Sequence, residues 1–307
     1  MRLKVFLFIT LIAASASADY REFKQITIDP SITTKVQRAA ETSLKQFPAM
    51  KAEDLAISVV DLTKESILAR GDYHGDDPFY PASVIKIFFM VDTFLKNKFD
   101  LPDVPRAVRE MIGVSDNDAT AYIVDILANT EPGPDLDPKA LERFIDQRRS
   151  INRDFARLGY DMISAMGKPW SFGPYGRDRQ LIGPNRVNRN KLTANATTSL
   201  MLWIARGRAP EAALMLNFLA RPLGTLRPDE NQVTEFIGAS APADAKFYAK
   251  AGWTSEVRHD TAYIELHDGR KFVLTIFTRG QAADVKLVPA IARNVFLEFE
   301  VAVPPAP

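Results

Sequence analysis

The chain has 307 residues, 46% of them hydrophobic, which is enough apolar material to bury the core of one large domain or of two interleaved lobes. Its 39 lysine and arginine residues nearly cancel its 38 aspartate and glutamate residues, so the composition predicts no nucleic-acid partner and no attraction to an anionic membrane surface. The absence of cysteine excludes disulfides, thiolate chemistry and cysteine-ligated zinc.

The N-terminus has the pattern of a secretory signal peptide over residues 1–18. Arg2 and Lys4 give a basic start, residues 5–14 form an apolar run, and residues 16–18 are the small residues typical of a cleavage site. The alternative is a membrane anchor, but the run is too short to cross roughly 30 Å of hydrocarbon as a helix. We therefore expect export to a periplasm or to the medium, with no stable membrane insertion after the signal is cleaved.

A helix is predicted between Asp29 and Pro48, because apolar residues recur there with helical spacing. Two β-rich runs follow at 55–62 and 66–70, and the polar residues between them are typical of a hairpin. These segments predict the start of a sheet.

The middle of the chain, from residue 82 to about residue 222, has mostly helical periodicity. Strand patterns then return at 246–252, 260–267 and 271–278, and a closing helix is predicted at 283–298. Sheet segments at both ends with helices between them predict an α+β fold, in which one antiparallel sheet is built from both termini and flanked by terminal helices. The predicted divisions are a signal peptide at 1–18, an α/β lobe formed by 19–81 and 240–302, an inserted all-helical lobe at 82–239, and a disordered tail at 303–307.

Ser83 and Lys86 form the first candidate catalytic pair, at the start of an apolar helical stretch. Helical spacing of three residues puts their side chains on the same face. A serine hydroxyl is a weak nucleophile until a base removes its proton, and a buried lysine can lose its charge and serve as that base. The ordinary alternative is a serine cap with a lysine one turn later.

Two further motifs follow along the chain. Ser115-Asp116-Asn117 precedes another apolar helix, where Ser115 can relay a proton, Asn117 can bind a substrate carbonyl, and Asp116 is more suited to capping the helix. Lys250-Ala251-Gly252 ends a predicted strand, where the ammonium can attract a substrate carboxylate and the glycine allows the backbone to approach closely. Either motif alone is also explained by helix capping or by chance.

The order and setting of the three motifs resemble those of class A β-lactamases and penicillin-binding proteins. The resemblance covers most of the mature chain, since the two-ended sheet and the inserted helices also match that family. It implies that Ser83 is acylated, that Lys86 is the base, that Ser115 and Lys250 shuttle protons, and that Asn117 binds the substrate amide. It also implies an oxyanion hole made by the backbone N–H groups of Ser83 and Trp253, beside Gly252.

Arg258 lies eight positions beyond Lys250 and is a candidate second cation for the substrate carboxylate, because a guanidinium can bind a carboxylate through two hydrogen bonds. A solvated surface arginine is the equal alternative at this position. No metal ion or organic cofactor is implied.

Three features depart from the class A pattern. Ser83 and Ser115 are closer in sequence than is usual, and Ala251 replaces the usual threonine or serine. No glutamate occurs between Glu142 and Glu211, where class A enzymes carry the base that activates the deacylating water. Asp178 is a weak candidate for that missing role.

We therefore predict an exported serine hydrolase that acts on β-lactams or related amides. The alternatives are a penicillin-binding D-alanyl-D-alanine peptidase, which acts on peptidoglycan peptides, and a binding protein that does not turn over. An α/β-hydrolase is disfavoured because no GxSxG motif occurs, and a metallohydrolase is disfavoured because the three histidines lack metal-binding spacing.

Overall fold

The computed structural model describes residues 20–304, except residues 65, 171 and 225–230. The predicted signal peptide and the last three residues of the predicted tail lie outside the described residues. Within the described part of the chain, no helix has both the length and the apolar character needed to cross a membrane.

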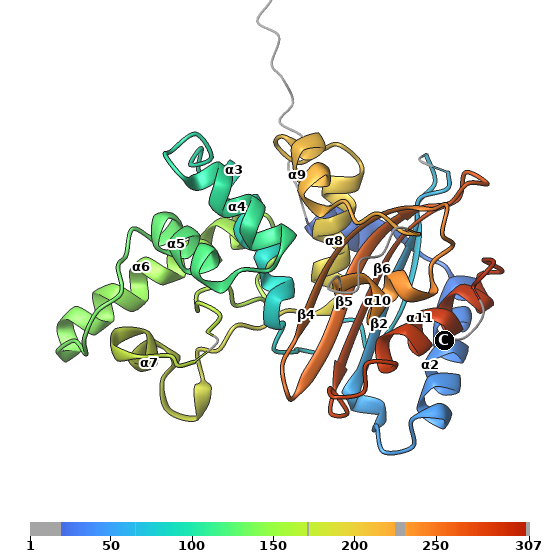
Figure 1. Ribbon diagram of the computed structural model, residues 1–307, viewed down its shortest axis with the longest axis horizontal. Coiled ribbons are helices and arrows are strands. Elements are labelled where there is room, and N and C mark those ends of the chain that lie inside the picture. Colours follow the sequence, from blue (N-terminus) through green and yellow to red (C-terminus); the bar gives the residue numbers. More distant parts are fainter. Residues whose placement is uncertain (1–19, 65, 171, 225–230, 305–307) are drawn as a thin grey trace, which may run out of the picture.

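A six-stranded sheet forms the centre of the molecule, and strands from both halves of the sequence meet inside it (Figure 1). β2 (Leu55–Asp61) lies against β6 (Lys271–Arg279) in antiparallel register, with Ile57 opposite Ile276. The α+β prediction with a sheet built from both termini is therefore confirmed. In spatial order the strands are β1 (Thr27–Ile28), β3 (Ala69–Tyr73), β2 (Leu55–Asp61), β6 (Lys271–Arg279), β5 (Val257–Glu265) and β4 (Lys246–Trp253).

The strands differ from the sequence prediction mainly at one edge. β1 has only two residues, too few for a detectable period, and pairs in parallel with β3. β3 (Ala69–Tyr73) begins near the end of the predicted run 66–70 and extends beyond it, so the connection from β2 is longer than a tight hairpin. β4 is the other edge strand, and it contacts the 3-10 turn Ala82–Ile85. Lys250 and Gly252 lie in this strand.

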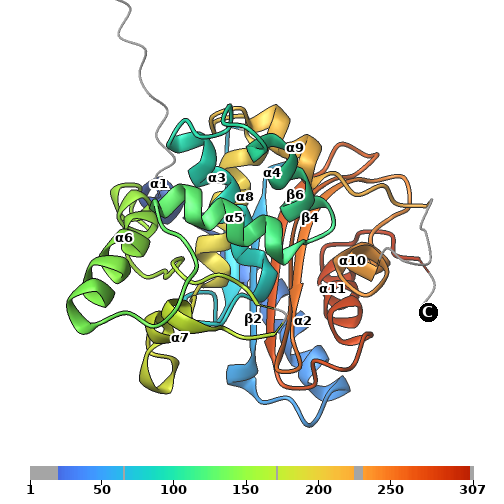
Figure 2. The same cartoon turned by 60° about the vertical axis from the view of Figure 1, so that its left-hand side comes forward.

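Two terminal helices cover one face of the sheet (Figures 1 and 2). α2 (Pro30–Gln46) begins where the Asp29 carboxylate accepts a hydrogen bond from the Ser31 N–H, a typical N-cap. α11 (Leu287–Glu298) packs against α2, and Asn294 donates a hydrogen bond of 2.9 Å to the Ser43 hydroxyl between them. Apolar residues of α2 and α11 pack against this face, which explains the helical periodicity of both segments.

The remaining helices, except α10 (Asn231–Thr234), lie on the opposite side of the sheet. α8 packs directly on the sheet, where the Thr198 hydroxyl donates a hydrogen bond of 2.7 Å to Thr275 of β6. α10 lies beside α11, and both contact the 3-10 helix Ile237–Ser240 (Figure 2). The larger helices on the opposite side are α3 (Lys86–Leu95), α4 (Val104–Gly113), α5 (Asn117–Ala128), α6 (Pro138–Arg157), α7 (Gly176–Ile182), α8 (Ala194–Ala205) and α9 (Ala212–Leu219).

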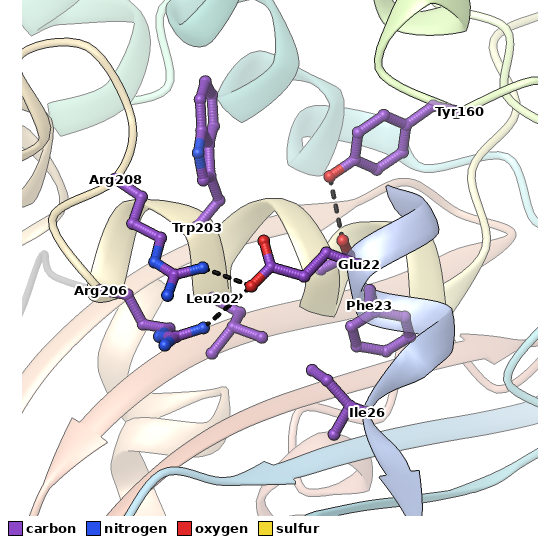
Figure 3. A pocket seen from close by; sticks show the side chains of 9 residues that line it. Glu22, Phe23, Ile26, Tyr160, Leu202, Trp203, Arg206 and Arg208 are labelled. Carbon is purple, nitrogen blue, oxygen red and sulfur yellow. Dashed lines mark hydrogen bonds and ion pairs between the residues drawn. The ribbon is translucent and has the colours of Figure 1, made fainter. Parts of the chain in front are cut away.

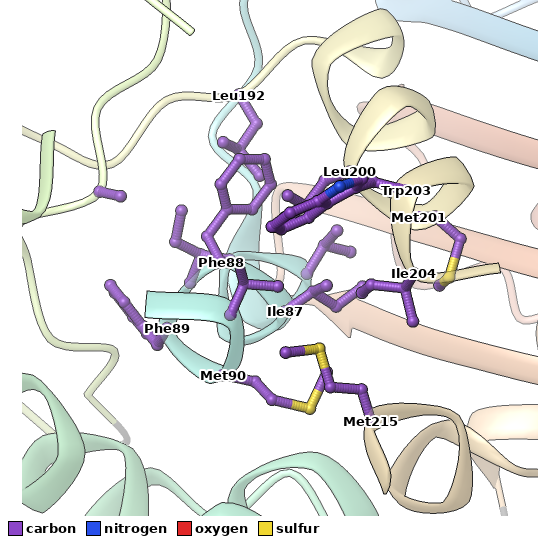
Figure 4. Packing of buried hydrophobic residues seen from close by; sticks show 14 of the residues in the cluster. Ile87, Phe88, Phe89, Met90, Leu192, Leu200, Met201, Trp203, Ile204 and Met215 are labelled. Carbon is purple, nitrogen blue, oxygen red and sulfur yellow. The ribbon is translucent and has the colours of Figure 1, made fainter. Parts of the chain in front are cut away.

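One apolar cluster joins the predicted helical lobe to the sheet. Phe88 and Met90 of α3 pack beside Leu200 and Ile204 of α8, as Figure 4 shows. The same cluster includes Phe277 and other residues of the sheet. The lobes predicted on either side of residue 82 therefore share this cluster, while a separate cluster lies between the sheet, α2 and α11.

The short helix α1 (Tyr20–Gln25) belongs to the predicted α/β lobe but packs on α8 of the predicted helical lobe. Tyr20 and Phe23 are buried in the shared core. On the outer side, the Glu22 carboxylate pairs with the guanidinium groups of Arg206 and Arg208, which follow α8 (Figure 3). The first turn of the described chain is thus attached to the helical side of the molecule.

Replacing Phe88 by alanine should destabilise the fold by about 3–5 kcal/mol, because the ring is fully buried and packs edge-on against Phe155 and Tyr160. Phe172→Ala is the matched control, since that ring is 83% exposed and its loss should change stability by no more than about 0.5 kcal/mol. Denaturant unfolding of the two variants measures the difference. Equal stability of both would contradict the packing described here.

Candidate active site

Ser83 lies in a short 3-10 turn, Ala82–Ile85, that leads directly into α3. Ala82 adopts a left-handed backbone with φ of 45°, which is unfavourable for a residue with a side chain. Val84 and Ile85 are fully buried, whereas Ser83 is partly exposed. Val84 and Ile85 thus anchor the turn while Ser83 stays partly exposed beside the edge strand β4.

Lys86 begins α3, and its amine is surrounded by oxygen atoms of the Ser115-Asp116-Asn117 turn. The amine donates hydrogen bonds to the Ser115 carbonyl at 2.6 Å, to the Asn117 side chain at 2.8 Å and to the Ser115 hydroxyl at 3.1 Å. Burial lowers the pKa of Lys86 to about 7, although the nearby charge of Asp116 acts in the opposite direction. A substantial share of Lys86 is therefore neutral near neutral pH and able to accept a proton.

Ser115 and Asn117 are positioned by the start of α5. Ser115 has a φ of 60° in the turn between α4 and α5. The Asp116 carboxylate caps α5 by accepting the Ala119 N–H at 2.6 Å, so Asp116 has the structural role suggested by the sequence. The strained turn directs both the hydroxyl and the carbonyl of Ser115 at Lys86.

Lys250 of the edge strand β4 contacts the same hydroxyl. Its amine donates to the Ser115 hydroxyl at 3.0 Å, to the Gln232 side chain at 2.9 Å and to the Ala251 carbonyl at 2.7 Å. Complete burial, and then the charge of Lys86, lower the pKa of Lys250 well below its usual value. The Ser115 hydroxyl thus lies within hydrogen-bonding distance of two lysine amines and can pass a proton between them.

Gly252 brings the edge strand β4 into contact with the Ser83 turn. A β-carbon at this position would lie 2.6 Å from the Ser83 nitrogen and 2.7 Å from the Val84 nitrogen, both backbone atoms. No side chain fits in this space. Trp253 follows at once, so its N–H lies one residue from the contact; the oxyanion hole expected from Ser83 and Trp253 stays a prediction.

Arg258 is placed differently from the other predicted site residues. It lies opposite Trp253 in the register between β4 and β5, but it is buried, and its guanidinium pairs with the Glu235 carboxylate and lies over the Phe236 ring. The Arg258 guanidinium is therefore already paired with a carboxylate of the same chain. A role in binding the substrate carboxylate would require Glu235 to be displaced, and it stays a prediction.

Asp178 is held in a cluster of four charged side chains at the base of the loop between α6 and α8. Its carboxylate lies 3.0 Å from Arg148 and 3.7 Å from Lys168, and both cations also pair with Asp125. Only about 2% of Asp178 is exposed. If this carboxylate were released, the buried charge of Arg148 would keep only Asp125 as an ion-pair partner, which is unfavourable. Asp178 is therefore better suited to holding the loop in place than to activating water.

Three polar residues that the motif search missed support the site. Gln232 connects the Lys250 amine to the Gly113 carbonyl, to which it donates at 3.0 Å. His259 lies opposite Gly252, donates from Nε2 to the Tyr80 carbonyl at 2.8 Å, and accepts the Thr278 N–H at Nδ1. Burial lowers the pKa of His259 to about 4, so the ring is neutral.

Asp260 is the third of these residues and is fully buried beside His259. It accepts hydrogen bonds from the backbone N–H groups of Ile237 and Thr261, and burial raises its pKa to about 7. The adjacent histidine and aspartate at the start of the predicted strand 260–267 were the available sequence signal for both residues.

Comparison with known proteins gives a family match. A model of the beta-lactamase enzyme family matches residues 102–299, a range that contains Ser115 and Lys250 but begins after Ser83. No curated protein sequence gives a significant match.

Solved structures share the fold at low sequence identity. They include a PBP-A mutant captured as an acyl-enzyme complex with penicillin G, a beta-lactamase from Sphaerobacter thermophilus, and the TLA-1 extended-spectrum beta-lactamase. Their identities to this chain are 18%, 18% and 11%, with TM-scores of 0.62, 0.61 and 0.61. The alignments cover 88%, 86% and 86% of this chain and 97%, 96% and 99% of those chains, so the likeness extends over the whole fold.

Gly252→Ala should reduce the rate at which Ser83 reacts with a fluorescent penicillin by about a hundredfold, because the added carbon displaces the turn that holds the nucleophile. Gly113→Ala is the matched control, since a β-carbon there meets no atom within 4 Å. Rates are compared after circular dichroism shows that both variants fold. A Gly252→Ala protein that reacts as fast as the control would show that the contact is unimportant.

Proposed function

Because the chain belongs to the beta-lactamase enzyme family, we propose that it is a serine hydrolase whose Ser83 is acylated by a β-lactam or a related amide. The observation that carries this proposal is the Ser115 hydroxyl, hydrogen-bonded at 3.1 and 3.0 Å to the two buried lysines Lys86 and Lys250. This arrangement supplies both a base and a path for its proton beside Ser83.

The proposed acylation proceeds in balanced steps. The Ser83 hydroxyl loses its proton to neutral Lys86 as its oxygen attacks the substrate carbonyl carbon. The carbon–nitrogen bond then breaks, and the proton passes from Lys86 through the Ser115 hydroxyl to the leaving nitrogen. Lys250 stabilises negative charge on the leaving side, and Asn117 binds the substrate amide.

A second candidate is a protein that forms a long-lived acyl-enzyme, either a peptidase acting on D-alanyl-D-alanine peptides or a binding protein without turnover. It is favoured by the pairing of Asp178 with Arg148 and Lys168 and by the lack of any glutamate between Glu142 and Glu211. Without a carboxylate to activate water, deacylation is slow. Both candidates share the acylation half-reaction.

We also propose that the protein is exported, with residues 1–18 as the cleaved signal. The support is the basic start, the apolar run and the small residues of that segment. An exported enzyme would meet β-lactams and peptidoglycan peptides outside the cytoplasmic membrane.

Intact-mass spectrometry after mixing with a penicillin should show a covalent adduct, and Ser83→Ala should show none. Sampling over time separates the two candidates: an adduct that disappears as the drug is hydrolysed supports a β-lactamase, and one that persists supports the peptidase or binding protein. A folded wild-type protein that never gains the adduct would overturn acylation of Ser83 by β-lactams.

The acylation rate should rise with pH and level off above about pH 7, because burial lowers the pKa of Lys86 to that value and its neutral form accepts the Ser83 proton. The rate falls below that pH as Lys86 becomes protonated. Stopped-flow measurement of acylation across pH tests this. In Lys86→Arg the guanidinium stays charged and the rising limb should be absent; a wild-type rate that does not change with pH would exclude Lys86 as the base.

A further inference from the structure

A cavity lies near the nucleophile, on the side of the loop between α6 and α8. It has a volume of about 210 Å³, and its lining includes Tyr80 and Thr254. Tyr80 is three residues before Ser83, and Thr254 is two residues beyond Gly252, which touches the Ser83 turn. Two residues of extended strand span about 7 Å, so a substrate group bound at Ser83 can reach the cavity.

The cavity is cationic and aromatic. Lys168, Arg186 and Arg189 line it together with Trp170 and Tyr80, and none of its described lining residues carries a carboxylate. This arrangement is unexpected in a chain with balanced charge. It favours an anionic group over a neutral or cationic one.

The three cations are not equally available. The Lys168 amine is committed to Asp125 at 2.6 Å and is almost completely buried. Arg186 and Arg189 share the single carboxylate of Glu256, at 3.8 and 3.3 Å, and Glu256 is more than half exposed. Two guanidinium groups with one exposed carboxylate leave a surplus positive charge at the mouth of the cavity.

Arg189 is the best positioned of these groups. Its guanidinium carbon lies 3.4 Å from the centre of the Tyr80 ring, and only 28% of its side chain is exposed. Stacking on the ring holds the planar guanidinium in place, so it loses little freedom when it binds a carboxylate. Partial burial also strengthens its attraction for an anion relative to an arginine in bulk water.

The direction of β4 indicates which end of the substrate reaches this cavity. Lys250 lies at one end of the site, Gly252 touches Ser83 in the middle, and Thr254 lies toward the cavity. If the leaving side is bound by Lys250, the acyl side extends toward Thr254. On the basis of the proposed function, we propose that this cavity is a subsite in which Arg189, supported by Arg186, binds a carboxylate on the acyl portion of the substrate.

Benzylpenicillin and carbenicillin test this subsite, because carbenicillin differs by one added carboxylate on its acyl side chain. The ratio of their second-order acylation rates cancels any general loss of activity. We expect wild type to favour carbenicillin by about tenfold, a typical effect of one charge-assisted hydrogen bond. Arg189→Gln should bring the ratio close to one, and Glu256→Gln should increase it.

Arg153→Gln is the matched control, since it removes an exposed arginine of α6 that pairs with Asp146 and should leave the ratio unchanged. A wild-type ratio of one or below, or a ratio that Arg189→Gln does not change, would overturn the subsite. The opposite shifts expected for Arg189→Gln and Glu256→Gln cannot both arise from misfolding.

A second pair of probes keeps the test independent of penicillin chemistry and distinguishes the source of the anion. N-succinyl- and N-butyryl-D-alanyl-D-alanine differ by one carboxylate, and their binding to Ser83→Ala is measured by calorimetry. Tighter binding of the succinyl peptide, lost with Arg189→Gln, supports the subsite even if no penicillin reacts and the proposed acylation by β-lactams fails. Equal binding of the two peptides overturns a subsite for peptide substrates.

Discussion

Two lysine amines that share one serine hydroxyl are the central constraint of this molecule. Lys86 and Lys250 are both buried, and each lies about 3 Å from the Ser115 hydroxyl. Two ammonium groups so close together repel each other, and burial further disfavours their charge. The structure compensates with neutral oxygen acceptors from the Ser115 turn, Asn117, Gln232 and the backbone.

Three separate parts of the sequence must meet to satisfy this constraint. Lys86 comes from the start of α3, Ser115 from the turn before α5, and Lys250 from the edge strand β4. Gly252 of β4 contacts the Ser83 turn directly. His259 of the neighbouring strand β5 donates a hydrogen bond to the carbonyl of Tyr80, which precedes that turn. The sheet therefore positions the nucleophile as well as Lys250.

The same construction explains why one apolar cluster connects the sheet to α3 and α8. α8 packs on the sheet through Thr198 and its apolar residues, and α3 packs on α8 through Phe88. If the helices could move independently of the sheet, the distances from Ser115 to the two lysines could not be maintained. Ion pairs among Asp125, Arg148, Lys168 and Asp178 attach the loop that borders the cationic cavity to the rest of the fold.

The sequence alone predicted the α+β class and the order of the main helices and strands. It also showed the family resemblance carried by Ser83, Lys86, Ser115, Asn117, Lys250 and Gly252. Such features depend on local periodicity and short spacings, which are visible in a linear chain. Four contacts became visible only in the folded structure. Glu235 forms an ion pair with Arg258, and Asp178 forms ion pairs with Arg148 and Lys168. The Arg189 guanidinium stacks on the Tyr80 ring beside the site. Except for the ion pair of Asp178 with Lys168, the two partners of each contact are at least 23 positions apart in the sequence. Electrostatic pairing depends on distance in space, which the linear sequence does not give.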